Sequence, residues 1–154
     1  MLIFTEKTDL SGIYLHIPFC KKACYYCDFH FSTSLKSQKS FVLALLQEIK
    51  NKKNYLQNET IKTIYFGGGT PSLLSSEEII QIIKEIKKHH KVSPTAEITL
   101  EANPDDLTKE KTEQLSSLGI NRLSIGIQTY QEELLKKINR SHNKQQAIEC
   151  VRNA

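Results

Sequence analysis

Residues 61–86 read IKTIYFGGGTPSLLSSEEIIQIIKEI and contain one complete strand-loop-helix unit. The run from Ile61 to Phe66 is apolar, β-branched and aromatic, and it stops at glycines, which is typical of a buried strand. Ser75, followed three residues later by Glu78, predicts a capping box that opens a helix. Helical spacing then gives this helix one apolar face, formed by Ile79, Ile82, Ile83 and Ile86.

The same order of elements recurs along the rest of the chain. Further short apolar runs predict strands at Ile13 to Ile17, Ile98 to Leu100 and Leu123 to Ile127. Helical spacing of apolar residues follows each run, at Val42, Leu45, Leu46 and Ile49, at Leu115 and Leu118, and at Leu134, Leu135 and Ile138. Strand followed by helix, four times over, requires parallel pairing through right-handed crossovers. The predicted fold class is therefore α/β, with a sheet that is either doubly wound or a piece of a barrel.

Signals at the helix ends support this division. Thr108 can cap the third helix, and Gly119 can end it in a left-handed conformation. A fifth helical segment begins at Lys144 and carries Cys150, which we expect to be a buried small side chain. Because the chain stops at Ala154 without a further strand, we expect it to be a fragment of a longer protein.

The composition is that of a globular chain, with 154 residues of which 39% are apolar and 25% charged. These values exclude disorder, collagen and coiled coil as descriptions of the whole chain. No run approaches the roughly 18 apolar residues of a membrane span, and Met1 to Leu10 carries charges where a signal peptide would be apolar. We therefore expect a cytoplasmic protein without an integral membrane segment. The net charge of +4 is spread over helix surfaces, so nucleic acid is not an expected partner.

Three of the four cysteines are clustered as Cys20, Cys24 and Cys27, in a C-x3-C-x2-C spacing directly after the first predicted strand. Such clustering indicates metal or redox chemistry rather than a secreted disulfide scaffold. Three thiolates on one loop can bind one side of a 4Fe-4S cluster and leave one iron without a protein ligand. The alternatives are a structural zinc site with His30 as fourth ligand, a redox pair with a spectator cysteine, or three buried small side chains.

Residues suited to chemistry follow every predicted strand. The cysteines follow the first strand, Gly67 to Thr70 the second, Glu101 the third and Gln128 the fourth. Because the carboxyl ends of parallel strands and the helix N-termini meet at one edge, we expect a binding site there. The glycines would let a cofactor lie against bare backbone, or they form a flexible turn. Glu101 could accept hydrogen bonds from a ribose diol, or be exposed at the rim.

A series of motifs in fixed order resembles the radical S-adenosylmethionine (SAM) enzymes of the coproporphyrinogen dehydrogenase group. The motifs are Tyr14-x5-Cys20-x3-Cys24-x2-Cys27, Phe66-Gly67-Gly68-Gly69-Thr70-Pro71, Glu101-Ala102-Asn103-Pro104 and Ser124-Ile125-Gly126-Ile127-Gln128. The resemblance covers about residues 12–142. It implies a 4Fe-4S cluster on Cys20, Cys24 and Cys27, with SAM chelating the unique iron through its amino and carboxylate groups. It also implies that an electron from the cluster cleaves the sulfonium to give methionine and a 5′-deoxyadenosyl radical.

Carried over residue by residue, the resemblance assigns eight further residues to SAM. Tyr14 and Tyr26 would lie beside the cofactor, and Glu101 would bind its ribose. The methionine part would contact Gly68, Gly69 and Thr70, and the pocket would be completed by Gln128 and Arg140. Each assignment has a structural alternative: the tyrosines can be packing residues, Gln128 a strand cap, and Arg140 a solvated cation at a helix end.

The third cysteine distinguishes branches within this group. In oxygen-independent coproporphyrinogen III oxidases, the resemblance implies a Cys-x-Cys pattern that begins at the third cysteine. This chain has Cys27-Asp28-Phe29-His30 there and lacks the extra cysteine. The sequence is thus more similar to the group's haem chaperones, which bind haem and deliver it to client proteins. Conversion of coproporphyrinogen III to protoporphyrinogen IX is the alternative function, so whether the chain is an oxidoreductase stays open. A zinc-stabilised Cys3His binding module is a second alternative.

The fold that the resemblance implies is a partial (βα)6 radical SAM barrel, with about four βα units within residues 1–154. These residues would be the N-terminal part of a radical SAM core domain, without its last strands and without the C-terminal domain. Haem or porphyrin would bind through that missing part, and an electron donor and a haem-accepting client would be further partners. The free edge of the fourth strand would be an aggregation hazard in isolation.

Overall fold

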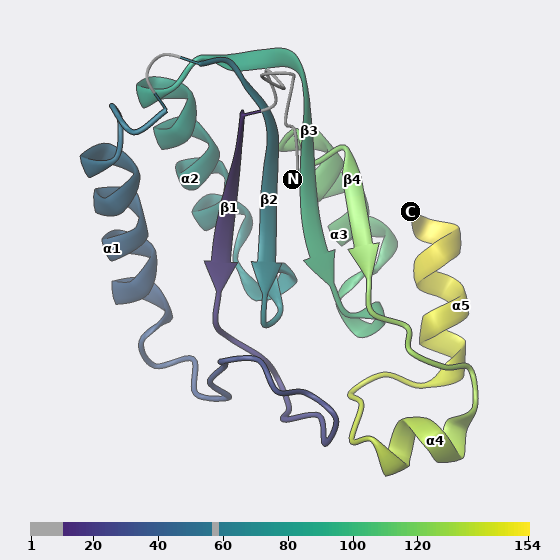
Figure 1. Ribbon diagram of the computed structural model, residues 1–154. Coiled ribbons are helices and arrows are strands. Elements are labelled where there is room, and N and C mark those ends of the chain that lie inside the picture. The colour runs from purple at the N-terminus through teal and green to yellow at the C-terminus, as the bar shows by residue number, and fades with distance from the viewer. Residues whose placement is uncertain (1–10, 57–58) are drawn as a thin grey trace, which may run out of the picture.

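A computed structural model of the chain describes residues 11–56 and 59–154. The expectation for Met1 to Leu10 concerns residues outside these ranges. Within them, four parallel strands form one sheet in the order β1-β2-β3-β4 (Figure 1). The strands are β1 (Ser11–Ile17), β2 (Ile61–Gly68), β3 (Val92–Ala102) and β4 (Arg122–Ile125). The predicted α/β class with a parallel sheet is confirmed.

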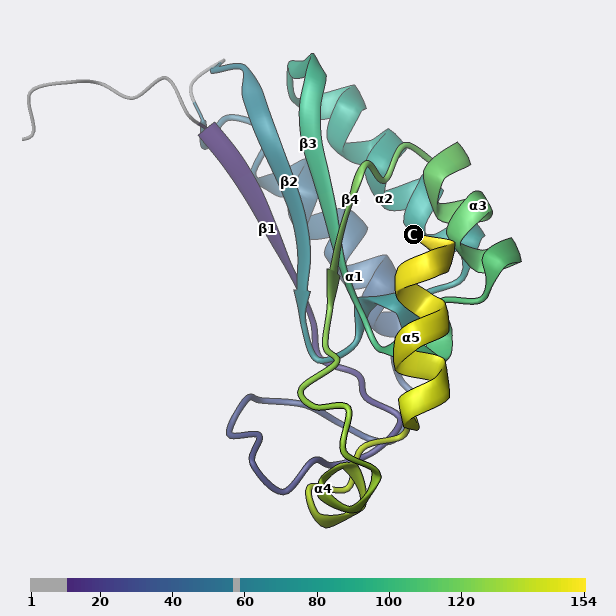
Figure 2. The same cartoon turned by 90° about the vertical axis from the view of Figure 1, so that its right-hand side faces the viewer.

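The helices of the described residues cover a single face of this sheet. They are α1 (Gln38–Asn51), α2 (Ser76–His89), α3 (Lys109–Ser117), α4 (Glu132–Lys137) and α5 (Lys144–Asn153), with short 3-10 turns η1 (Pro71–Leu73) and η2 (Pro104–Asp106). Figure 2 shows α1, α2, α3 and α5 on the same side of the strands, with α4 beyond their carboxyl ends. A steadily increasing strand order with right-handed crossovers places the helices this way, as in the wall of a barrel. A doubly wound sheet would carry helices on both faces. In the described ranges, no helix has the length and apolar character needed to span a membrane.

Strand ends differ from the predicted ones where backbone pairing, rather than side-chain polarity, sets the boundary. β3 begins earlier than the predicted Ile98 because its polar first half pairs with the start of β2. β2 extends beyond its apolar run because the backbones of Gly67 and Gly68 pair with the end of β1. β4 stops at Ile125, where the backbone N–H of Ile127 turns back to donate to the Ile125 carbonyl at 3.0 Å.

The apolar face predicted for α2 is buried against the sheet. The four isoleucines of this face are 0–1% exposed: Ile79, Ile82, Ile83 and Ile86. They share one core with alternate strand residues such as Leu15, Ile64 and Leu100. Burying each such side chain contributes roughly 1.5–3 kcal/mol, more than the roughly 1 kcal/mol typical of a helix cap. Side-chain packing therefore fixes α2 on the sheet, and its cap sets where the helix begins.

The predicted caps are present at the loops that follow the strands. The hydroxyl of Ser75 accepts from the Glu78 N–H at 3.2 Å, and the Glu78 carboxylate accepts from the Ser75 N–H at 2.8 Å. The hydroxyl of Thr108 accepts from the Lys111 N–H at 3.2 Å, and Gly119 has a φ of +95° just after α3. These caps limit the length of the loops that leave the sheet edge.

The other face of the sheet carries polar and aromatic side chains. Tyr14 stacks on Tyr65 with ring centroids 5.9 Å apart, and Glu101 lies on the same face. This is the side that a closing barrel encloses. In the described part of the chain, β4 pairs with β3 alone, so its outer edge has no strand partner.

Candidate functional site

The loops at the carboxyl ends of the strands enclose one pocket, on the side where α4 lies (Figure 1). Every predicted site residue except Tyr14 lines it: Cys20, Cys24, Tyr26, Cys27, Gly68, Gly69, Thr70, Glu101, Gln128 and Arg140. These residues come from all four strand ends and from the loop between α4 and α5. The predicted site edge therefore matches the edge at which the structure gathers them.

The cysteine loop is closed by backbone hydrogen bonds rather than by regular secondary structure. The Cys20 N–H donates to the Ser32 carbonyl at 3.0 Å, and the Ser32 N–H donates to the Pro18 carbonyl at 2.8 Å. A tight turn follows, in which the Cys27 N–H donates to the Cys24 carbonyl at 3.1 Å. All three cysteines are free and half-buried. The loop thus presents three thiols to the pocket.

Burial raises the pKa of the Cys20 thiol above its ordinary value, and the neighbouring Cys27 and Cys24 add to the effect. The Thr70 hydroxyl, 3.6 Å from the Cys20 sulfur, opposes this by donating to it, and the Arg140 cation acts in the same direction as Thr70. The metal-free loop therefore favours the protonated thiol at Cys20. Metal binding would release that proton, because the thiolate is the ligand.

His30 does not join the cysteines, as the zinc alternative requires. His30 lines the grooves beside β1 and α1 together with Pro18 and Phe41, whereas the cysteines line the pocket at the strand ends. Residues 11–56 and 59–154 contain no group of three His, Cys, Asp or Glu side chains placed to hold one metal ion. A Cys3His zinc site needs four donors at about 2.0–2.3 Å from one ion. Nothing in the arrangement favours that site.

The glycine loop touches the end of β1 closely. The Gly69 N–H donates to the Ile17 carbonyl at 2.9 Å, and the Thr70 N–H donates to the Phe19 carbonyl at 2.7 Å. A Cβ on Gly69 would lie 2.6 Å from the Phe19 oxygen and 3.0 Å from the Cys20 sulfur. Gly68 has a φ of +111°, which side-chain-bearing residues rarely adopt. The glycines are therefore required by a defined backbone shape and do not form a merely flexible turn.

Glu101 ends β3 with both carboxylate oxygens bonded. One oxygen accepts from the Tyr65 hydroxyl at 2.7 Å and the other from the Gly68 N–H at 3.1 Å. The hydrogen bond to Glu101 is the main cause that raises the pKa of Tyr65, so the phenol stays protonated and donates. Glu101 is thus anchored at the pocket wall by a strand and a loop, rather than extending freely from the rim.

Arg140 lies after the end of α4 and is held inside the pocket. Its Nη2 donates to the Asn103 Oδ1 at 2.6 Å and to the Gly126 carbonyl at 2.6 Å. Its Nη1 lies 3.3 Å from the Tyr26 hydroxyl and 3.5 Å from the Cys24 sulfur. In the described residues its buried Nε has no acceptor. Arg140 is therefore not a solvated helix-end cation, and it retains a donor for an anionic group.

Gln128 follows β4 in a strained conformation. Its φ of 65° lies in the left-handed region, which is uncommon for residues other than glycine and is found at binding sites. The loop is held by Arg140 and by His142, whose Nε2 lies 3.1 Å from the Ile127 carbonyl. Burial lowers the pKa of His142, so the neutral ring can donate from Nε2. The strain at Gln128 is thus maintained by neighbouring side chains.

The two predicted tyrosines have different positions. Tyr26 lines the pocket, and burial is the main cause that raises its pKa. Tyr14 lies on the open face of the sheet, where its hydroxyl is 3.2 Å from the His16 Nδ1 and its ring stacks on Tyr65. Tyr14 thus does not line the pocket but lies beside its wall, because Tyr65 donates to Glu101; its position beside SAM stays a prediction.

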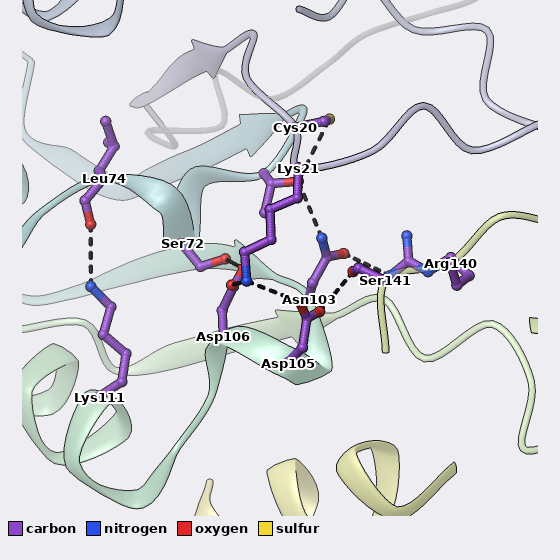
Figure 3. A network of polar contacts seen from close by, with 11 residues as sticks. Cys20, Lys21, Ser72, Leu74, Asn103, Asp105, Asp106, Lys111, Arg140 and Ser141 are labelled. Carbon is purple, nitrogen blue, oxygen red and sulfur yellow. Dashed lines mark hydrogen bonds and ion pairs between the residues drawn. The ribbon is translucent and has the colours of Figure 1, made fainter. Parts of the chain in front are cut away.

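The residues after the third strand include a polar cluster that the motifs do not predict. Lys21 forms ion pairs with Asp105 and Asp106, and Figure 3 shows its side chain extending from the ribbon that carries Cys20 to the two aspartates. Two acidic residues in the first turn of η2 are a sequence signal for a helix N-terminus. That signal does not indicate that Lys21, which is distant in the sequence, is their partner.

The comparisons with known proteins agree with this fold and pocket. The Radical SAM superfamily model matches residues 14–154. The chain therefore belongs to the radical SAM superfamily, and the predicted class, a partial radical SAM barrel of four βα units, is confirmed.

Curated relatives place it more narrowly. The chain is 44% identical over 147 residues to "Heme chaperone HemW" of Buchnera aphidicola subsp. Schizaphis graminum, covering 94% of this chain and 39% of that protein. It is 39% identical over 144 residues to the HemW of Escherichia coli, covering 92% of this chain and 38% of that protein. With the HemW of Bacillus subtilis it shares 42% identity over 136 residues, covering 86% and 36%. The chain thus spans about two fifths of the length of these relatives.

A solved structure gives the same assignment of fold. Coproporphyrinogen III oxidase (HemN) from Escherichia coli, described as a radical SAM enzyme, superposes with a TM-score of 0.85 at 28% sequence identity. The match covers 93% of this chain and 33% of that one. Similarity to HemW and HemN proteins, expected from the motifs, is confirmed.

Proposed function

We propose that residues 1–154 are the N-terminal part of a radical SAM core domain that binds a 4Fe-4S cluster and SAM, within a protein that serves as a haem chaperone. The observation that carries the proposal is the shared pocket. Ten of the eleven residues assigned by motif line it, although they come from five separate loops. Such convergence at the carboxyl ends of parallel strands is how barrels of this class build their sites.

The donor set fits the cluster. Three free thiols on one loop are soft ligands that suit iron-sulfur clusters, and the pocket contains no fourth cysteine to close the last iron. Cys20, Cys24 and Cys27 would hold the cluster. When bound, it would supply an electron to the sulfonium of SAM.

Polar groups around the cysteines fit SAM. Arg140, whose buried Nε has no acceptor within residues 11–56 and 59–154, provides a cation for the carboxylate of the methionine part. Glu101 already accepts two hydrogen bonds and could exchange one for a ribose hydroxyl. Gly68, Gly69 and Thr70 present backbone to the ligand, and Gln128 bounds the opposite wall.

The residues that follow Cys27 in the sequence support the haem-chaperone assignment. In the oxidase pattern Cys-x-Cys, the second cysteine would stand at position 29, where this chain has Phe29, and Asp28 takes the intervening position. The side chain of Phe29 is 71% exposed. The relatives named HemW support the same choice. Haem, an electron donor and a client protein would engage the part of the protein beyond these residues. A cytoplasmic location is proposed with them, because free thiols persist in reducing surroundings.

We expect the purified chain to turn brown when it is reconstituted anaerobically with iron and sulfide. Three thiolates should hold about four iron and four sulfide atoms per chain. Iron and sulfide analysis measures the uptake, and the electron paramagnetic resonance (EPR) spectrum of the reduced sample should change when SAM is added. A colourless protein that retains one zinc per chain after purification would contradict the proposal.

The chaperone assignment predicts haem binding without turnover in the full-length polypeptide. Absorbance titration with haem should give saturable binding, and haem should pass to an apo-haemoprotein acceptor. Incubation with coproporphyrinogen III, SAM and a reductant should leave the propionates intact by mass spectrometry. Formation of protoporphyrinogen IX would instead identify an oxidase.

A further inference from the structure

Lys21 lies between Cys20 and Cys24 in the sequence but points behind the pocket toward η2. Its ammonium group is 2.9 Å from the Asp105 Oδ2 and also contacts the Asp106 Oδ1 (Figure 3). Both carboxylates have a second partner in a serine hydroxyl. Ser72 donates to Asp106 at 2.5 Å, and Ser141 donates to Asp105 at 2.8 Å. We call these five residues, Lys21, Ser72, Asp105, Asp106 and Ser141, the Lys21 clamp.

The ion pairs of the clamp are not surface pairs. The side chains of Asp105 and Asp106 are 11% and 6% exposed, against 38% for Lys21. Burial alone would lower the pKa of Lys21, but hydrogen bonds to Asp106 and Asp105 outweigh it and raise that pKa. Burial would likewise raise the pKa of Asp105, but Lys21 and Ser141 lower it overall. The cation and the Asp105 carboxylate therefore both stay charged, and removing the cation would leave buried charge without a partner.

The clamp joins four of the five loops that carry the cofactor residues, all except the loop after β4 that carries Gln128. Lys21 follows Cys20 directly, and Ser141 follows Arg140 directly. Ser72 lies in η1 just after Thr70, and the two aspartates lie in η2 just after Asn103. Lys21, Ser72 and both aspartates do not line the pocket, so they can hold its walls without meeting a ligand.

The cysteine loop needs such an anchor because it has no helix or strand of its own between Cys20 and Cys27. Beyond Lys21, the ties from this stretch to other loops reach the α4 end of the pocket: the Tyr25 N–H donates to the Ile138 carbonyl at 3.2 Å, and the Asn139 amide donates to the Ala23 carbonyl at 2.8 Å. Lys21 ties this stretch to η2, which follows β3.

We propose that Lys21 is a positioning residue whose ion pairs with Asp105 and Asp106 hold the cysteine loop in its binding-competent place relative to the other three loops. This role rests on the proposed function, because the loop position matters only if the cysteines hold a cluster. Groups that orient metal ligands from behind typically change metal affinity by about 10–100-fold.

The test compares Lys21→Met with Lys36→Met. Lys36 is exposed in the turn before α1 and lies outside the pocket, so its substitution removes the same charge without disturbing the clamp. After anaerobic reconstitution, a ferrous chelator should strip iron from Lys21→Met roughly tenfold faster than from the wild type. Lys36→Met should match the wild type, and Lys21→Arg should restore slow loss. The EPR spectrum of reduced Lys21→Met should also respond less to SAM than that of Lys36→Met.

A double variant separates the loss of the anchor from the destabilisation caused by buried carboxylates without a cation. Lys21→Met/Asp106→Asn keeps the net charge of the clamp and removes the more buried of the two carboxylates that would lack a cation. Asp105 keeps its hydrogen bond from Ser141, so the double variant should fold even if the single variant does not. We expect it still to lose iron fast. Wild-type rates in both variants would overturn the proposal.

A metal-free measurement distinguishes this failure from failure of the proposed function. If the wild type takes up no cluster, the function is wrong, and hydrogen-deuterium exchange of residues 20–28 still tests the clamp. Faster exchange there in Lys21→Met than in Lys36→Met would support the anchor, and equal exchange would refute it.

Discussion

Cys24→Ser is expected to abolish the uptake of iron and sulfide. The three cysteines are the only soft donors in the pocket as described, and each would hold a different iron of one cluster. A serine hydroxyl is harder than a thiol and stays protonated near neutral pH, so it does not replace the missing ligand. Iron and sulfide should fall from about four per chain to background, together with the brown absorbance.

The matched control is Cys150→Ala, because Cys150 is also a free cysteine but lies buried in α5, apart from the pocket. Its thiol donates to the Ala147 carbonyl at 3.2 Å, and removing it should lower stability by about 1 kcal/mol without affecting cluster content. Retention of the full cluster by Cys24→Ser, or its loss from Cys150→Ala, would show that the pocket thiols are not the ligands.

The fold could be predicted because its signals are local. Isoleucine spacing fixes the buried face of α2, and Ser75 with Glu78 fixes where that helix begins. The site edge follows from the same reasoning, since parallel strands place their carboxyl ends together. The cysteine cluster could also be predicted from a local signal, because its three members lie on one short loop.

Other parts of the site depend on contacts that no local pattern carries. Lys21 and Asp105 are 84 positions apart, and nothing in either neighbourhood indicates the other. Gln128 has a left-handed backbone conformation that a glutamine does not itself favour. Arg140 and His142, which come later in the sequence, hold the loop in that conformation. The alternation of strand side chains places Tyr14 on the open face of the sheet, which it shares with Glu101, and its stacking on Tyr65 is a contact between strands that no local pattern indicates.

The second large effect is expected at Gly69. A methyl group there would lie 2.6 Å from the Phe19 oxygen, 2.9 Å from the Phe19 nitrogen and 3.0 Å from the Cys20 sulfur. The backbone of Phe19 cannot move away easily, because its ring is buried and packs edge-on against Phe41 at 5.4 Å. Gly69→Ala should therefore push apart the glycine loop and the cysteine loop. We expect a loss of roughly 1–3 kcal/mol in unfolding free energy, typical of overpacking, and little or no cluster after reconstitution.

Gly119→Ala is the control that separates crowding at the pocket from a general loss of stability. Gly119 has a φ of +95°, and no atom lies within 4 Å of a Cβ placed on it. Its substitution should cost about 1–2 kcal/mol through left-handed strain, comparable to Gly69→Ala, and should leave iron uptake intact. Denaturant unfolding and iron analysis on both variants make the comparison. If Gly69→Ala binds iron as well as Gly119→Ala does, the close approach of the two loops is not what places Cys20. If both variants lose the cluster to the same extent, the loss reflects stability alone.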